Sequence, residues 1–158
     1  MSPPRLTYDA FARIAPATPQ ALIAMGRQAD ESGIDKQIVE LVKLRVSQLN
    51  NCAFCLQIHL NVSRKLDLPQ EKLDLVATWE EAGIFSEREC AALAWAETLT
   101  RLVGHSVPDA AYEAVRRHFS EEEVTFLSVS IATINAWNRL GAAFRFAPPI
   151  VKAIRPAT

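Results

Sequence analysis

The chain has 158 residues, of which 49% are hydrophobic and 22% charged, and its formal net charge at pH 7 is −1. This length and composition predict one globular domain with a sizeable core and exclude a disordered chain. The net charge gives no electrostatic reason to expect nucleic acid or an anionic membrane surface as a partner. No apolar run reaches the roughly 18 residues that span a bilayer, and the N-terminus lacks the apolar segment of a signal peptide, so we expect a cytoplasmic location.

Capping signals and apolar spacing predict about seven helices, and no segment shows the sustained two-residue alternation of a strand. The expected helices cover residues 18–33, 35–49, 52–66, 69–79, 86–104, 108–118 and 120–144. We therefore predict an all-α, single-domain helical bundle over residues 1–158, with its core at 19–145. Residues 1–18 should pack as an N-terminal arm or a short helix, and residues 146–158 should form an extended C-terminal tail.

The expected helix at 35–49 is apolar on nearly all of its faces, which is typical of a helix at the centre of a bundle. A single small domain has limited interior in which to bury such a helix, so we also expect a homo-oligomer. Glu40 is conspicuous in this helix, because an unpartnered buried carboxylate costs several kcal/mol to desolvate.

Cys52, Cys55 and His59 follow a turn of two asparagines and fall at positions i, i+3 and i+7, so they share one face of the expected helix at 52–66. We expect Asn51 to be the N-cap, which puts both thiols near the first turn. There the free N–H groups and the helix dipole favour a thiolate. His59 lies one turn beyond Cys55, about 6 Å along the helix axis.

Glu40 joins this group if the chain reverses at the asparagines, because residues equally far from the turn of an antiparallel helix pair become neighbours. Glu40 lies about as far before the turn as His59 lies after it, so the two side chains should be level. A carboxylate, an imidazole and a thiol together can orient a base and move a proton onto or off sulfur. The candidate catalytic residues are therefore Glu40, Cys52, Cys55 and His59.

Three cysteines, two of them in a Cys-x-x-Cys motif, favour redox or metal chemistry over a secreted disulfide scaffold. Zinc could accept all four candidate residues as ligands. However, Cys52 and His59 are about 10 Å apart along one helix axis, whereas a single zinc requires both ligand atoms within roughly 2.0–2.3 Å. We therefore expect a redox pair and no metal, and we interpret Cys90 as a buried free thiol.

Glu40, the Cys52-Ala53-Phe54-Cys55 motif and His59 together resemble the alkylhydroperoxidase D-like, or carboxymuconolactone decarboxylase-like, superfamily. The specific part of the resemblance covers residues 40–66. The segment at 134–139 also looks like that family, and we interpret its amides and its cation as polar pairing across helices in preference to the edge of an active cavity. The Glu, Cys-x-x-Cys and His combination is typical of the redox branch, whereas the decarboxylase branch generally lacks the cysteine pair.

The resemblance implies an all-α fold, assembly into trimers or hexamers, and a dithiol/disulfide peroxidase or reductase acting on small-molecule hydroperoxides. By analogy, Cys55 would attack the peroxide, Cys52 would be the resolving thiol, and Glu40 with His59 would form the proton relay. No cofactor is then expected besides the redox-active Cys52–Cys55 disulfide, which a lipoyl protein or a thioredoxin-like dithiol would reduce. The well-studied members carry a second histidine between the cysteines, where this chain has Phe54, so one polar group of the relay is missing here.

Two other functions stay open at this point. A decarboxylase-type enzyme without redox turnover would use Glu40 and His59 as acid/base groups on a small lactone or keto acid. A non-catalytic thiol stress sensor would oxidise at Cys52 and Cys55 without turning over. Titration of the thiols with peroxide separates the peroxidase from the decarboxylase, and turnover with a dithiol reductant separates it from the sensor.

Overall fold

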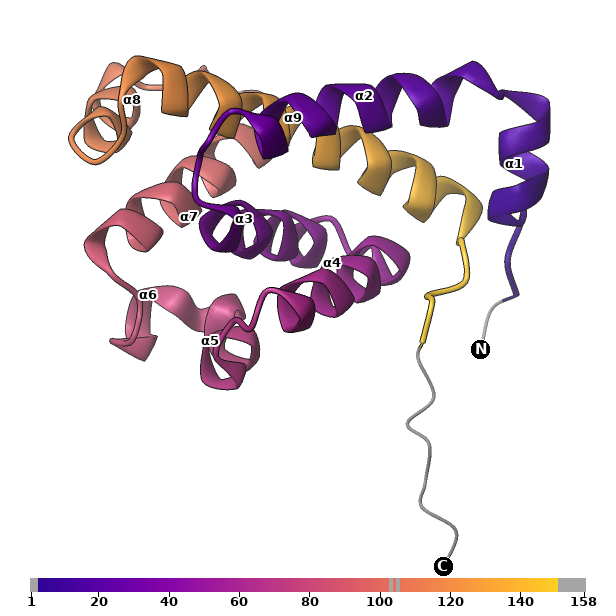
Figure 1. Ribbon diagram of the computed structural model, residues 1–158, viewed down its shortest axis with the longest axis horizontal. Helices are drawn as coiled ribbons and strands as arrows, with labels where there is room; N and C mark the ends of the chain where they lie inside the picture. The colour runs from indigo at the N-terminus through magenta and orange to yellow at the C-terminus, as the bar shows by residue number, and fades with distance from the viewer. Residues whose placement is uncertain (1–2, 103, 105, 151–158) are drawn as a thin grey trace, which may run out of the picture.

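The computed structural model describes residues 3–102, 104 and 106–150, and every regular element in that part of the chain is a helix. This confirms the all-α prediction. The elements, coloured along the chain in Figure 1, are α1 (Tyr8–Ile14), α2 (Ala17–Glu31), α3 (Lys36–Leu49), α4 (Ala53–Lys65), α5 (Gln70–Leu75), the 3₁₀ turn η1 (Val76–Thr78), α6 (Trp79–Ala82), α7 (Glu87–Thr100), α8 (Asp109–Arg116) and α9 (Glu121–Phe144).

Two short helices in the described residues add to the seven that the sequence predicted. Helix α1 lies within the expected N-terminal arm, where a short helix was one of the two expectations. The prediction of a single helix at 69–79 is wrong, because the 3₁₀ turn η1 separates α5 from α6. Thr78 ends η1, and its hydroxyl donates to the carbonyl of Leu75 at 3.3 Å, which is the local competition with helical bonding that threonine offers.

Capping boxes begin α7 and α9, where capping signals at Ser86 and Ser120 predicted the starts of two helices. Ser86 Oγ accepts the N–H of Glu89 at 3.2 Å, and Glu89 Oε2 accepts the N–H of Ser86 at 2.8 Å. Ser120 and Glu123 repeat the arrangement at 3.1 and 2.8 Å. Each reciprocal pair satisfies N–H groups that a helix otherwise leaves without a partner.

Helix α3 lies at the centre of the bundle and packs against α4, α7 and α9 (Figure 1). Its Val39 and Val42 belong to an apolar cluster shared with α7 and α9, while its Leu41 and Leu44 belong to a second cluster shared with α5, η1 and α7. Burial on both sides explains why α3 is apolar on nearly all faces. Because the residues that cover it belong to the same chain, its apolarity does not require a second subunit, and the homo-oligomer stays a prediction.

Segments on both sides of the expected core pack onto it. Phe11 of α1 and Phe146, which follows α9, are both buried, and their ring centroids lie 5.6 Å apart. The N–H of Arg5 donates to the carbonyl of Phe144 at 2.9 Å. Residues 3–15 and 146–150 therefore close one end of the bundle, while the rest of the expected tail, 151–158, lies outside the described residues. Within the described ranges, no helix has the length and hydropathy needed to cross a membrane.

Candidate active site

The two cysteines of the Cys-x-x-Cys motif form a disulfide at the start of α4, with their Cα atoms 5.4 Å apart and both side chains buried. Cys52 is itself the N-cap, and its Sγ accepts the N–H of Cys55 at 3.3 Å. The prediction that Asn51 caps this helix is therefore wrong. Asn51 instead adopts the left-handed conformation (φ 52°) that reverses the chain, which asparagine tolerates better than most residues, so the cap falls one position later.

Helix α9 closes one side of the disulfide at Gly141, a residue that the sequence reasoning missed. A Cβ atom added to Gly141 would lie 2.6 Å from Cys52 Sγ and 3.3 Å from Cys55 Sγ, closer than ordinary van der Waals contact. Glycine is therefore needed here for the close approach of a helix backbone to the two sulfurs. No local pattern could reveal this, because the contact joins positions far apart in the sequence.

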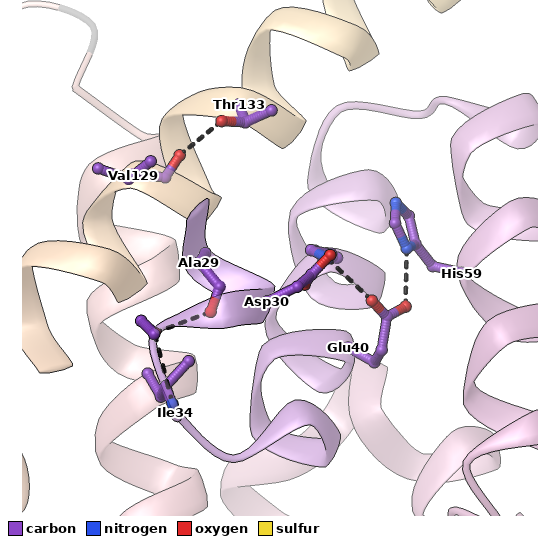
Figure 2. Close-up of polar contacts among 9 residues, drawn as sticks. Ala29, Asp30, Ile34, Glu40, His59, Val129 and Thr133 are labelled. Carbon is purple, nitrogen blue, oxygen red and sulfur yellow. Dashed lines mark hydrogen bonds and ion pairs between the residues drawn. The ribbon is translucent and has the colours of Figure 1, made fainter. Parts of the chain in front are cut away.

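Glu40 and His59 meet across the antiparallel pair of α3 and α4, as the equal distances from the turn predicted. His59 Nδ1 and Glu40 Oε2 are 2.7 Å apart, and Figure 2 shows the carboxylate directed at the ring. Glu40 is 5% exposed. With the carboxylate ionised, the neutral imidazole donates from Nδ1 and keeps Nε2 free to accept a proton.

Lys43 is a third member of this group that the sequence reasoning missed. Its Nζ lies 3.0 Å from Glu40 Oε1 and 3.4 Å from Asp30 Oδ1 on α2. Burial opposes ionisation of Glu40, but the hydrogen bond with His59, the positive charge that His59 carries when its ring is protonated, and the charge of Lys43 outweigh it, so the pKa of Glu40 lies below its ordinary value. The i, i+3 spacing of Glu40 and Lys43 on one helix face was a signal that could have identified the contact.

A cavity of about 610 Å³ lies beside the disulfide, within the size range of small-molecule sites. Cys55 and His59, one turn apart on α4, both line it, whereas Cys52 does not. The other lining residues come from five helices and the segment after α9, and are Tyr8, Leu22, Ile23, Gly26, Arg27, Asp30, Lys43, Phe54, Ile58, Ser130, Thr133, Ile134, Trp137 and Pro149. Of the two sulfurs, Cys55 is therefore the one that a molecule in the cavity would meet.

Phe54, between the two cysteines, forms part of an aromatic wall of the cavity. Its ring stacks on Tyr8 with centroids 5.8 Å apart and meets Phe146 edge-on at 5.3 Å. Tyr8 also contacts Trp137, with ring centroids at 6.4 Å. Aromatic packing therefore holds the start of α4 against α1 and the segment after α9. Phe54 stands at the position that the family resemblance assigns to a second histidine.

A network of amides holds the turn that precedes the disulfide. Asn50 Nδ2 donates to Asn135 Oδ1 at 2.9 Å and to Asn138 Oδ1 at 3.0 Å, and Asn138 Nδ2 donates to Ser47 Oγ at 3.3 Å. This confirms the interpretation that the polar segment of the last helix pairs across helices. Trp137 of the same segment lines the cavity, so the segment also contributes to the cavity edge.

The third cysteine, Cys90, stands apart from the site. It is a half-buried free thiol, and burial together with the nearby Glu89 carboxylate raises its pKa, so it forms less thiolate at neutral pH than an unperturbed cysteine. Across the described ranges, no three His, Cys, Asp or Glu side chains are grouped so that they could hold a metal ion.

Comparison with known proteins identifies the family. Residues 16–98, more than half of the chain, match the model of the carboxymuconolactone decarboxylase family. The chain belongs to this family. The uncharacterized protein YdfG of Bacillus subtilis strain 168 is 35% identical to it over 133 residues, which cover 84% of this chain and 90% of that protein.

Solved structures agree with the superfamily that the sequence resemblance named. A protein of unknown function from Agrobacterium tumefaciens, described as a candidate antioxidant defence protein AhpD, matches with a TM-score of 0.87 and 34% identity, covering 94% of this chain and 100% of that one. An uncharacterized peroxidase-related protein from Ralstonia eutropha JMP134 with an AhpD core matches with a TM-score of 0.75 and 24% identity, covering 88% and 74%. The second match shows the fold alone, which is AhpD-like.

Proposed function

We propose that this protein is a thiol-dependent peroxidase that reduces hydroperoxides with the Cys52/Cys55 couple. The observation that carries the proposal is the position of Cys55, which lines the cavity, forms a disulfide with Cys52 and lies one turn from the Glu40–His59 pair. A small molecule in this cavity would meet a redox-active sulfur and a base together.

The reaction begins with the reduced pair. His59 takes the proton from the Cys55 thiol, and the thiolate attacks the outer oxygen of the hydroperoxide, so the O–O bond breaks and Cys55 becomes a sulfenic acid. The alkoxide that leaves takes up the proton and departs as an alcohol. The thiol of Cys52 then attacks the Cys55 sulfenic sulfur, which releases water and forms the disulfide.

An external dithiol resets the enzyme by thiol–disulfide exchange and is itself oxidised to a disulfide. Both sulfurs are buried and Cys55 borders the cavity, so a slender dithiol such as a lipoyl arm fits this approach better than the rigid surface of a thioredoxin-like protein. Attack would fall on Cys55, and Cys52 would leave as a thiolate that the N–H of Cys55 and the start of α4 stabilise.

The test is the reaction of the fully reduced protein with hydrogen peroxide and with cumene hydroperoxide, followed by thiol counting and peptide mass spectrometry. We expect the loss of two thiols and a Cys52–Cys55 crosslink. Cys52→Ser should stop at a sulfenic acid that dimedone traps, while the control Cys90→Ser should behave as the wild type does. Oxidation confined to Cys90 would refute the proposal.

Steady-state assays with dihydrolipoamide and with reduced thioredoxin then separate the enzyme from a sensor. The enzyme turns over with at least one of these dithiols, whereas a sensor oxidises once and stops. The family name also refers to a decarboxylase, and such a reaction in this chain would use the Glu40–His59 pair and no sulfur. An activity on a small lactone or keto acid that persists in Cys55→Ser would favour that alternative.

A further inference from the structure

Lys43 lines the cavity and contacts the Glu40–His59 pair through Glu40. Its ammonium group contacts Glu40 on its own helix and Asp30 on α2, and its side chain is only 12% exposed. Lysine is rarely covered to this extent unless its charge is paired. Here the closer of its two partners is the carboxylate that faces His59, so the pairing belongs to the candidate site.

The two oxygens of the Glu40 carboxylate have separate partners. Oε2 faces His59 Nδ1 at 2.7 Å, the contact drawn between Glu40 and His59 in Figure 2, and Oε1 faces Lys43 Nζ at 3.0 Å. The last torsion of a glutamate side chain is broad when nothing holds it. Because the carboxylate is planar, a partner on Oε1 also fixes the direction of Oε2, and thereby the orientation of the imidazole.

The positive charge of Lys43 also favours ionisation of the Glu40 carboxylate, which burial opposes. The charged or titratable side chains that face Glu40 or the cavity are Tyr8 from α1, Arg27 and Asp30 from α2, Lys43 from α3, and His59 and, in the reduced protein, Cys55 from α4. Among the described lining residues, α9 contributes hydroxyl and apolar side chains. Without Lys43, Glu40 would keep its burial and lose one of its two partners, which favours the protonated form, and a protonated carboxyl is a poor acceptor for His59.

We propose that Lys43 is a positioning residue for the thiol chemistry of Cys55, which holds the Glu40 carboxylate ionised and turned toward His59. The inference rests on the proposed function, because it assigns Lys43 to the same relay. In this assignment the proton moves between Cys55 and His59, and Lys43 acts on the step only through Glu40.

The test measures two rates at Cys55 of the reduced protein between pH 5 and pH 9: alkylation by iodoacetamide, quantified by mass spectrometry, and disulfide formation with peroxide. Lys43→Met should slow both about tenfold at pH 7, a fraction of what a general base contributes. It should also move the acid limb of both profiles to higher pH, because removal of Lys43 raises the pKa of Glu40 while burial remains. Lys43→Arg, which keeps the charge, should restore most of the rate.

Lys72→Met is the matched control, because Lys72 forms a similarly covered pair with Glu89 at 2.7 and 2.8 Å and does not line the cavity. It should leave both pH profiles unchanged. Lys43→Gln is a second neutral variant in case Lys43→Met does not fold, and it should shift the profiles in the same direction. Unshifted profiles in the neutral variants, or no recovery in Lys43→Arg, would overturn the inference.

This experiment distinguishes a failure of the peroxidase proposal from a failure of the Lys43 proposal. If the wild type is alkylated with the expected profile but does not react with peroxide, the peroxidase is refuted and the role of Lys43 in thiol ionisation is still measured. If the wild type reacts with peroxide and Lys43→Met does so with the same profile, the peroxidase stands and the role of Lys43 is refuted.

Discussion

Replacement of Gly141 by alanine should destabilise the oxidised protein, although alanine is the better helix former. In an unobstructed helix interior, glycine to alanine gains about 1 kcal/mol. At Gly141 the new Cβ would lie 2.6 Å from Cys52 Sγ, and the disulfide keeps that sulfur from moving aside easily. Overpacking of a well-packed site costs about 1–3 kcal/mol. The clash should therefore outweigh the propensity gain, with a net loss of up to about 2 kcal/mol.

Gly26→Ala is the matched control, because Gly26 is also a helical glycine and its added Cβ would meet Thr133 Cγ2 at 3.7 Å, an ordinary contact. The control should gain up to about 1 kcal/mol. In a chain of this size, 1 kcal/mol corresponds to a shift of about 2–4 °C in Tm. The two variants should therefore move Tm in opposite directions.

The assay is thermal unfolding of both oxidised variants at one protein concentration, followed by circular dichroism, with the disulfide verified by mass spectrometry. A Gly141→Ala protein that keeps the disulfide and is stabilised as much as Gly26→Ala would refute the close approach of α9 to the two sulfurs. A variant that folds only after reduction would support the same geometry, because the thiols can then separate.

Three further predictions concern the carboxylates and the amide network. Glu40→Gln should fold, because the amide is nearly isosteric, yet react with peroxide on the order of 10²-fold more slowly near neutral pH, and the deficit should shrink toward about pH 8.5, where a free thiol ionises without help. For Glu97, burial opposes ionisation, but bonds from Trp79 and Arg45 and the charge of Arg45 outweigh it, so its pKa lies below the ordinary value of 4.5. Its contribution to stability is therefore complete above pH 4.5 and is lost as pH falls through the lower folded-state pKa, so urea unfolding between pH 7 and pH 3 should show a steeper loss in the wild type than in Glu97→Gln. Asn138→Ala leaves the amide of Asn50 with one partner in place of two and should cost about 1–3 kcal/mol in the same unfolding assay, whereas an unchanged midpoint would show that the network does not hold the turn.

Local signals in the sequence were sufficient to predict most of the helices and the pairing of Glu40 with His59. Ser86 and Ser120 begin capping boxes within four residues of sequence, and the turn at Asn50 places Glu40 opposite His59 by counting alone. These inferences need only the geometry of one helix or of one antiparallel pair. The cap of α4 was misplaced because two local preferences of asparagine compete, and its tolerance of the left-handed region prevailed over its N-cap preference at Asn51.

The rest of the site depends on contacts between distant segments, which carry no local pattern. Gly141 reaches the disulfide from α9, Asp30 reaches Lys43 from α2, and Tyr8 reaches Phe54 from α1. In a single sequence, each of these residues is unremarkable for its helix. Only the tertiary packing, in which α9 contacts both α2 and α4 and α1 contacts α2, gives them a role.

With an aromatic side chain at position 54, the relay that we propose would depend on a single base. A phenylalanine cannot accept a proton, so among the described residues that line the cavity His59 is the imidazole available to Cys55. His59 in turn depends on Glu40, and Glu40 stays ionised in its buried position through His59 and Lys43. The stacking of Phe54 on Tyr8 gives the cavity an apolar surface, and under the proposed function this surface would favour the apolar body of an organic hydroperoxide over water. Phe54 would therefore contribute a binding surface beside Cys55 in place of a proton carrier.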